Sequence, residues 1–165
     1  KNLKNRNYIK FYLVGDGRAR ERLENAAKKE KLNNVIFTGK VSIEEADRYI
    51  HFADCAYLSF KDNKIFNMTI PAKLQSYMAC GTPILAAVGG ESADIITAAE
   101  CGIVCARNPL ELSETIEKMA SSRDNTAEMR KKAYEFYRRN YKKENLVDRF
   151  ESLIISSDSL NSVSN

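Results

Sequence analysis

Lys73 is the residue of this chain whose position most directly suggests chemistry. Pro71 favours the first turn of a helix, where its missing N–H leaves no donor unpaired. Leu74, Tyr77 and Met78 follow at helical spacing and give that helix an apolar face. Lys73 is then a cation in the first turn, where the helix dipole disfavours positive charge. An anion bound between the helix start and Lys73 would explain this placement, and the ordinary alternative is a lysine extended into solvent.

The residues after this helix predict a buried strand that ends in a glycine turn. Gly81 suits the left-handed position that ends a helix, and Thr82-Pro83 prevents the helix from continuing. The apolar run Ile84–Val88 is typical of a strand, and Gly89-Gly90 ends it in a turn.

Strands and helices alternate along the whole chain. Strands are predicted at 9–14, 35–38, 54–59, 84–88 and 102–105, and helices at 18–31, 42–52, 71–80, 91–99, 109–120, 127–141 and 143–155. Leu23, Ala26 and Ala27 are expected on the inner face of the first helix, and Ser42 with Glu45 forms a capping box for the second. This order predicts an α/β fold: a parallel sheet with helices on both faces.

Ligands of such folds bind beyond the carboxyl ends of the strands. The turns expected there contain glycine or several polar residues: Gly15–Gly17, Gly39–Val41, Ser59–Thr69 and Val88–Glu91. The polar loop Lys61–Met68 has a length that often indicates function. These turns predict one site for a polar ligand.

Composition limits the class of protein. The 165 residues suit one domain, with a flexible serine- and asparagine-rich tail expected over 156–165 and the domain itself over 1–155. A formal net charge of +4, spread along the chain, argues against a nucleic-acid binder. No apolar run is long enough to span a bilayer. The chain opens with Lys1 rather than Met, and we expect it to be a fragment of a longer protein.

Side chains that could hold a metal or act as nucleophiles do not form a convincing set. Four cysteines, Cys55, Cys80, Cys101 and Cys105, are poorly spaced for zinc and are expected to be buried free thiols in a reducing cytoplasm. His51 is the single histidine, without a plausible acid–base partner, so a serine or cysteine hydrolase is disfavoured.

Two other nucleotide motifs and a stacking platform are also disfavoured. In a dinucleotide fingerprint starting at Gly15, the third glycine would fall at Arg20, and no phosphate-binding P-loop motif is present. The aromatic residues near the carboxyl end have helical spacing, which favours packing over base stacking: Tyr134, Phe136, Tyr137 and Tyr141.

Several motifs in order resemble one family over about residues 8–140. They are Val14-Gly15-Asp16-Gly17, Arg22-Leu23-Glu24, Asn34–Gly39, Ala53-Asp54, Pro71-Ala72-Lys73-Leu74, Tyr77–Ile84 and Cys101–Val104. Together they resemble the carboxyl-terminal domain of group-one, GT-B-fold retaining glycosyltransferases. The resemblance implies a Rossmann-like half of a GT-B fold that grips the diphosphate of a nucleotide sugar, with no cofactor and no metal.

The resemblance also implies which residues bind the donor. The base and ribose are expected against Gly39–Val41 and Ser59–Lys61, the sugar near Asn67–Ile70, and the diphosphate beside Lys73 and Gly89-Gly90. The complete set of expected substrate-binding residues is Gly15, Gly39, Lys40, Val41, Phe60, Thr69, Lys73, Gln75, Ser76, Gly89, Gly90 and Glu91.

Two positions depart from the family pattern. The family usually carries two glutamates with seven residues between them, and here these positions hold Met68 and Ser76. No catalytic residue is therefore assigned, and Gln75 or Ser76 is expected to hold the ribose hydroxyls. This version resembles a bacterial subgroup that transfers amino sugars from UDP in surface-polysaccharide assembly.

The expected function is transfer of a UDP-linked sugar to a polysaccharide or lipid-linked acceptor. The resemblance implies a missing amino-terminal acceptor domain, without which the fragment would transfer little sugar, and a cytoplasmic protein at the inner face of the membrane. Two alternatives stay open: a nucleotide-sugar epimerase of the same architecture, and a degenerate domain that binds nucleotide or a partner protein without catalysis.

Overall fold

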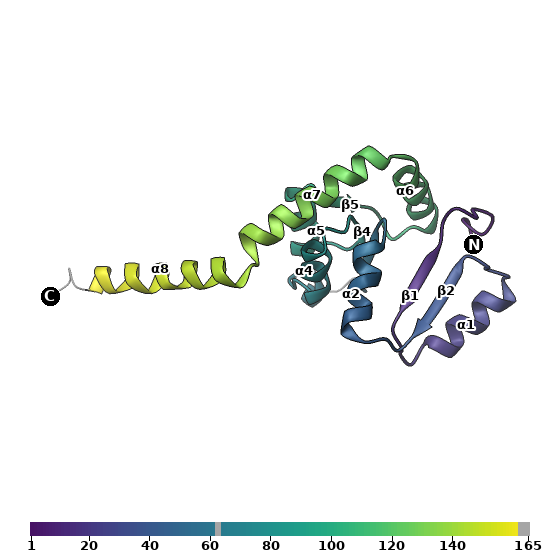
Figure 1. The fold of residues 1–165 in the computed structure, drawn as a ribbon, viewed down its shortest axis with the longest axis horizontal. Helices are drawn as coiled ribbons and strands as arrows, with labels where there is room; N and C mark the ends of the chain where they lie inside the picture. Colours follow the sequence, from purple (N-terminus) through teal and green to yellow (C-terminus); the bar gives the residue numbers. More distant parts are fainter. Residues whose placement is uncertain (62–63, 162–165) are drawn as a thin grey trace.

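A computed structural model describes residues 1–61 and 64–161 of the chain, in which strands and helices alternate (Figure 1). The elements are β1 (Phe11–Val14), α1 (Arg20–Lys29), β2 (Val35–Gly39), α2 (Ile43–Phe52), β3 (Ala56–Ser59), α3 (Lys64–Asn67), α4 (Ala72–Ala79), β4 (Ile84–Ala87), α5 (Glu91–Ala98), β5 (Gly102–Val104), α6 (Pro109–Ser121), α7 (Arg123–Asn140) and α8 (Lys143–Asn161).

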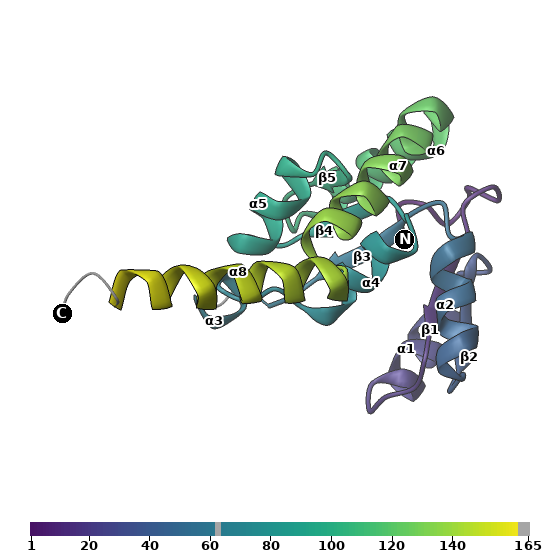
Figure 2. The ribbon, with the colours of Figure 1, turned by 60° about the vertical axis from the view of Figure 1, so that its left-hand side comes forward.

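All the strand pairs are parallel, and helices flank them, which confirms the predicted α/β class. The strands nevertheless form two sheets, one with the order β1-β2 and one with the order β3-β4-β5. A single continuous sheet, as the alternation of elements predicts, is not present among the described residues. The division falls between β2 and β3, which α2 connects (Figure 2).

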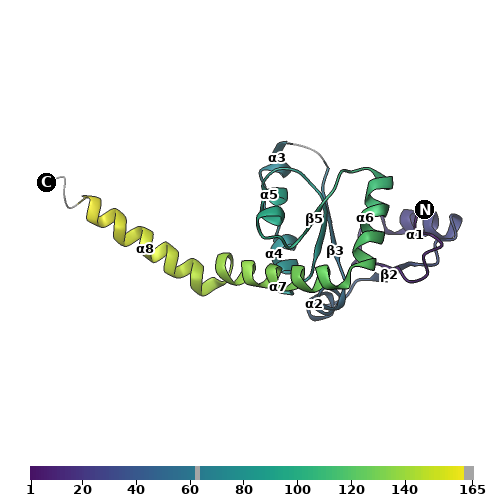
Figure 3. The ribbon, with the colours of Figure 1, turned by 90° about the horizontal axis from the view of Figure 1, so that it is seen from above.

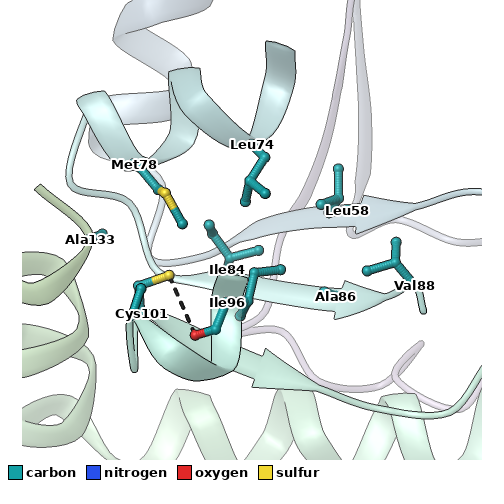
Figure 4. Close-up of a cluster of buried hydrophobic side chains, with 10 residues drawn as sticks. Leu58, Leu74, Met78, Ile84, Ala86, Val88, Ile96, Cys101 and Ala133 are labelled. Atoms are coloured by element: carbon teal, nitrogen blue, oxygen red, sulfur yellow. Dashed lines mark hydrogen bonds between the residues drawn. The ribbon is translucent and has the colours of Figure 1, made fainter. Parts of the chain in front are cut away.

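The hydrophobic core belongs to the three-stranded sheet. Every residue of β4 is buried, as expected for a central strand covered on both faces. Figure 4 shows Leu74 and Met78 of α4 above Ile84, with Cys101 and Ala133 beside them. The cluster of buried residues comprises Leu58, Leu74, Met78, Ile84, Ala86, Val88, Ile96, Ala99, Cys101 and Ala133.

The two-stranded sheet is covered much less. Helix α1 buries none of its residues, and Leu23 is 40 % exposed, so the prediction that it lies on an inner face was wrong. Tyr12 of β1 contacts Tyr49 of α2, with ring centroids 5.8 Å apart. The buried Asn34 side chain donates hydrogen bonds to the carbonyl oxygens of Leu3 and Ile9, which attach the amino-terminal segment to this sheet.

Local signals at the helix ends are mostly confirmed. The Ser42 hydroxyl accepts a bond from the Glu45 amide, and the Glu45 carboxylate accepts one from the Ser42 amide, as in a capping box. Gly81 has a φ of +61°, as a left-handed position after a helix requires. Pro71 lies one position earlier than predicted, as the residue preceding the first turn of α4.

The segment predicted as the loop Lys61–Met68 contains the four-residue helix α3, although residues 62 and 63 of this segment lie outside the described part of the chain. The aromatic residues Phe136, Tyr137 and Tyr141 pack against the core, which confirms the packing interpretation, whereas Tyr134 is 48 % exposed. Packing of α7 against α4 places these rings there.

Helix α8 projects away from the body of the molecule (Figure 3). It continues to Asn161 rather than ending at Ile155, so part of the predicted tail is helical, and residues 162–165 lie outside the described range. Phe150 and Leu153 are 65 % and 67 % exposed on this helix. Across the described residues, none of the helices combines the length and apolar character needed to cross a membrane.

Candidate functional site

Helix α4 presents Lys73 to solvent at its first turn. Leu74 and Met78 are fully buried and hold the helix against β3 and β4. Lys73 is exposed, and among the described residues its side chain forms no hydrogen bond or ion pair. Pro71 provides no side-chain cap, so the amide groups of the first turn lack a capping acceptor from it. The Leu74 amide donates to the Pro71 carbonyl oxygen at 3.0 Å, which leaves the amides of Ala72 and Lys73 as the candidate anion donors at this cationic end of the helix.

The second glycine turn, Gly89-Gly90, lies between the carboxyl end of β4 and the first turn of α5. Gly90 precedes the first turn of α5 with φ 63° and ψ −147°, a conformation essentially restricted to glycine. A Cβ atom at Gly90 would lie 2.0 Å from the carbonyl oxygen of Asn67, and one at Gly89 would lie 3.5 Å from Asn67 Oδ1. The end of α3 thus lies directly against this turn.

Hydrogen bonds hold Thr69 beside the second glycine turn. The buried Ser92 hydroxyl of α5 donates a hydrogen bond of 3.0 Å to the carbonyl oxygen of Thr69. The Thr69 hydroxyl donates to the Ile65 carbonyl oxygen of α3 at 2.6 Å. The structure therefore brings together four of the predicted residues, Thr69, Gly89, Gly90 and Glu91, around the amino terminus of α5.

The first glycine turn, Gly15–Gly17, follows the carboxyl end of β1 and is hydrogen-bonded to Gly39 at the carboxyl end of β2. The Gly15 amide donates to the Gly39 carbonyl oxygen at 3.0 Å and lies 3.3 Å from the Thr38 hydroxyl. Both glycines have positive φ angles, 111° for Gly15 and 73° for Gly39. A Cβ at Gly15 would meet no described protein atom within 4 Å, so another molecule could approach the backbone closely here.

Phe60 follows the carboxyl end of β3, where the sequence predicts a contact with the base or ribose. Its ring stacks on that of Phe66 in α3, with centroids 5.7 Å apart and an interplanar angle of 18°. Phe66 is 41 % exposed, so part of this stacked pair of rings is accessible to solvent beside α3. The pattern of the sequence did not single out Phe66.

Four further predicted residues are placed less favourably for one shared ligand. Gln75 is two residues after Lys73, which puts it about 200° around the helix. The Ser76 hydroxyl already donates to the Ala72 carbonyl oxygen at 3.2 Å. Lys40 is exposed after β2 and Val41 is half-buried. Among the described residues, no hydrogen bond or ion pair connects the first glycine turn with Lys73 or the second glycine turn.

Two arginines near the glycine turns were missed at the level of sequence. The Arg20 guanidinium lies beside Gly39, where a Cβ would stand 2.7 Å from one of its nitrogens, and it pairs with Glu24 at 2.8 Å. This hydrogen bond and charge raise the pKa of Arg20. Arg107 Nε donates to the Ala87 carbonyl oxygen at 3.0 Å, at the carboxyl end of β4. The four-residue spacing of Asp16, Arg20 and Glu24 could have indicated the ion pairs of Arg20 from the sequence.

The site has the components of an anion-binding surface. Its donors are the amide groups at the amino termini of α4 and α5, which favour anions, together with the cations Lys73 and Arg107. Among the described residues, no group of three histidine, cysteine, aspartate or glutamate side chains could hold a metal ion. The four cysteines are unpaired, as predicted, but Cys55, Cys80 and Cys105 are half-buried and Cys101 alone of the four is buried, so the prediction that all are buried was wrong.

Two cavities elsewhere contain none of the predicted residues. One of about 470 Å³ lies along α8 and is lined by residues that include Arg149 and Leu153. Another of about 370 Å³ lies between the amino-terminal segment, the β1-β2 sheet and α6, and is lined by residues that include Leu3 and Leu112.

Solved structures with a similar fold include a sucrose-phosphate synthase, TarM and a glycosyltransferase. Sucrose-phosphate synthase from Thermosynechococcus elongatus superposes with a TM-score of 0.70 at 19 % identity over 90 % of this chain and 38 % of its own. TarM superposes with a TM-score of 0.68 at 16 % identity over 92 % and 30 %. AviGT4, a glycosyltransferase involved in avilamycin A biosynthesis, gives a TM-score of 0.54 at 17 % identity over 79 % and 42 %.

The chain therefore has the GT-B type of α/β fold and spans less than half of each of these proteins. No curated protein sequence matches it. Residues 1–136 match the family described as glycosyl transferases group 1. This matched range includes both glycine turns and Lys73. The chain belongs to the group 1 glycosyl transferase family.

Proposed function

We propose that this chain is the donor-binding domain of a retaining glycosyltransferase that takes its sugar from a UDP-linked donor. The observation that carries the proposal is the family match over residues 1–136 together with the anion-binding amino termini of α4 and α5. A leaving nucleoside diphosphate gains negative charge as the glycosidic bond breaks, and oriented amides and nearby cations stabilise that charge.

Each group of residues has a role in this proposal. Lys73 and the Gly89-Gly90 amides contact the diphosphate, because Lys73 is exposed at the start of α4 and the two glycines lead into the amino terminus of α5. Phe60 and the segment Gly39–Val41 contact the base and ribose. Thr69 and Glu91 lie next to the transferred sugar, because Ser92 holds the Thr69 backbone beside the start of α5.

The acceptor is proposed to be a polysaccharide or lipid-linked sugar, bound by a separate amino-terminal domain in the cytoplasm at the inner face of the membrane. The limited coverage of the solved relatives supports a second domain, since the chain spans 38 % of sucrose-phosphate synthase and 30 % of TarM. On this basis the 165 residues bind donor but need the rest of the enzyme for transfer.

A second candidate function is nucleotide binding without catalysis. Met68 and Ser76 stand at the two positions where the family pattern has glutamates, and the Ser76 hydroxyl bonds to its own helix. A domain without either carboxylate could retain its fold and its ligand after losing turnover.

Calorimetric titration of the complete polypeptide with UDP, GDP and NAD tests the donor class. Binding of UDP alone supports the proposal, whereas binding of NAD alone contradicts it. Incubation with UDP-sugars and a lipid-linked acceptor then separates the two candidates: sugar transfer identifies the enzyme, and UDP binding with no turnover of any donor identifies the inactive binder.

A further inference from the structure

Two helices that begin beside predicted ligand residues end close to each other. Helix α2 starts at its cap, Ser42, directly after the segment Gly39–Val41, and leads into β3. Helix α4 starts after Pro71, carries Lys73 in its first turn, and leads into β4. Because β3 and β4 are parallel neighbours, both helices end at the amino edge of that sheet, on the side opposite to the expected ligand.

Side chains from outside the helix cap the carboxyl end of α2. The fully buried Thr82 donates a hydrogen bond of 2.7 Å from its hydroxyl to the Ile50 carbonyl oxygen. The Arg130 guanidinium of α7 donates to the carbonyl oxygen of His51 at 3.4 Å and to that of Ala53. The last carbonyl groups of a helix have no partner within it, and the negative end of the helix dipole favours a cation.

The same arginine reaches the end of α4. Its guanidinium donates to the Gly81 carbonyl oxygen at 3.3 Å, in the turn that follows this helix. Thr82 belongs to the same turn, since its amide donates to the Tyr77 carbonyl oxygen of α4 at 2.9 Å. Helices α2 and α4 also contact each other, and Figure 3 shows α7 running past both. Arg130 and Thr82 thus join the carboxyl ends of the two helices.

This joint restricts the angle between α2 and α4. The planar guanidinium of Arg130 holds its donors in a fixed fork, so the carbonyl groups that it bonds must keep their relative positions. With 10 residues, α2 is about 15 Å long, and a tilt of about 5° at its carboxyl end moves its amino end by roughly 1 Å. Loss of the joint would therefore shift Gly39–Val41 relative to Lys73 without a change to either.

We propose that Arg130, together with Thr82, is a positioning residue that sets the spacing between the amino ends of α2 and α4. This role rests on the proposed function, in which Gly39–Val41 contacts the base and ribose and Lys73 contacts the diphosphate. A ligand that spans two subsites gains affinity only when both subsites have the spacing that it requires. A ligand that fills one subsite does not depend on that spacing.

NMR titration of the complete polypeptide with UDP, uridine and pyrophosphate tests this role. Arg130→Met removes the guanidinium, and Arg139→Met, which removes an exposed arginine of the same helix, is the matched control. We expect Arg130→Met to weaken UDP binding about tenfold and to change the binding of uridine and of pyrophosphate by less than about twofold, with no change in the control. Unchanged UDP binding, or an equal loss for all three ligands, would overturn the role of Arg130.

Thr82 gives a second and independent pair of variants. Thr82→Val removes the hydroxyl from a side chain of nearly the same shape, whereas Thr82→Ser keeps the donor to the Ile50 carbonyl oxygen. We expect the selective loss of UDP binding in Thr82→Val and its recovery in Thr82→Ser. Equal UDP affinities of the two variants would contradict a joint made by this hydroxyl.

Residual dipolar couplings of the backbone amides separate the positioning role from the proposed function. In the wild type, one alignment tensor should fit both α2 and α4, and in Arg130→Met the couplings of α2 should fall relative to those of α4. Couplings in Arg130→Met that match the wild type would overturn the positioning role, whatever the ligand. If the wild type fails to bind UDP, the proposed function is contradicted, and the couplings still decide whether Arg130 fixes the two helices.

Discussion

Gly90 lies directly against the main chain of Asn67, so closely that a Cβ atom at position 90 would stand 2.0 Å from the Asn67 carbonyl oxygen. Helix α3 and the start of α5 therefore pack backbone to backbone. Ser92 adds a hydrogen bond from α5 to Thr69 in the segment that follows α3. The turn that presents the α5 amino terminus is thus held from two sides.

Gly90→Ala is expected to disrupt this turn. Alanine would have to adopt φ 63° and ψ −147°, which costs roughly 1–3 kcal/mol, and its methyl group would displace α3. We expect a lower midpoint of urea unfolding and weaker UDP binding. Gly17→Ala is the control for the unfolding midpoint, because a Cβ there meets nothing within 4 Å. Equal unfolding midpoints for the two variants would show that the contact has no importance.

Ser92→Ala is expected to loosen Thr69 at a cost of about 1 kcal/mol, because a buried hydrogen bond is lost and the Thr69 carbonyl oxygen loses its donor. Thr97→Ala is a matched control on the same helix, since its exposed hydroxyl bonds only to the Ala93 carbonyl oxygen. Urea unfolding measures both changes. A larger loss for Thr97→Ala than for Ser92→Ala would contradict the assigned role.

Leu74→Ala is expected to destabilise the domain by about 2–5 kcal/mol, because Leu74 is fully buried in the core cluster. Lys73→Ala, one residue earlier, should leave the unfolding midpoint unchanged, because that side chain is exposed. Thermal or urea unfolding of the two variants compares them directly. A destabilising effect of Lys73→Ala would mean that its side chain has a structural role.

The half-buried thiol of Cys55 and the buried thiol of Cys101 predict a loss of stability in alkaline solution. Burial raises the pKa of Cys55 to about 12 and that of Cys101 to about 11, from a usual value of 9.0. The folded state therefore keeps these protons between about pH 9 and 11, where the unfolded state releases them, so the free energy of unfolding falls as pH rises.

Urea unfolding of the wild type and of Cys55→Ala and Cys101→Ala between pH 8 and 10.5 measures this fall. Each variant carries one thiol fewer with a raised pKa, so its stability should decline less steeply above pH 9 than that of the wild type. An identical slope in all three proteins would rule out these thiols as the cause.

Much of the fold could be predicted because its signals are local. The capping box of Ser42 and Glu45, the left-handed Gly81 and the strand Ile84–Val88 each depend on residues adjacent in the chain. The short helix α3 was not predicted, because its four residues, Lys64–Asn67, are too few to show an apolar period.

The division of the sheet could not be predicted, since strand order depends on contacts between distant segments. The apolar pattern of β1 indicates a covered strand, yet the Tyr12 and Val14 side chains are exposed in the structure. For the candidate site, the glycine turns of the sequence predicted Gly15, Gly39, Gly89 and Gly90, and these stay predictions. Arg20 and Arg107 escaped notice because arginines on helices and after strands are common, and only the fold places them near those turns.

The central claim is that Lys73 binds the diphosphate of the donor beside the amino terminus of α4. Calorimetric titration of the complete polypeptide with UDP tests it, using Lys73→Ala and the control Lys118→Ala, which removes an exposed lysine of α6. We expect Lys73→Ala to weaken UDP binding about tenfold or more, as for loss of a charge-assisted contact, and Lys118→Ala to leave it unchanged. UDP binding by Lys73→Ala with the affinity of the wild type would contradict the account.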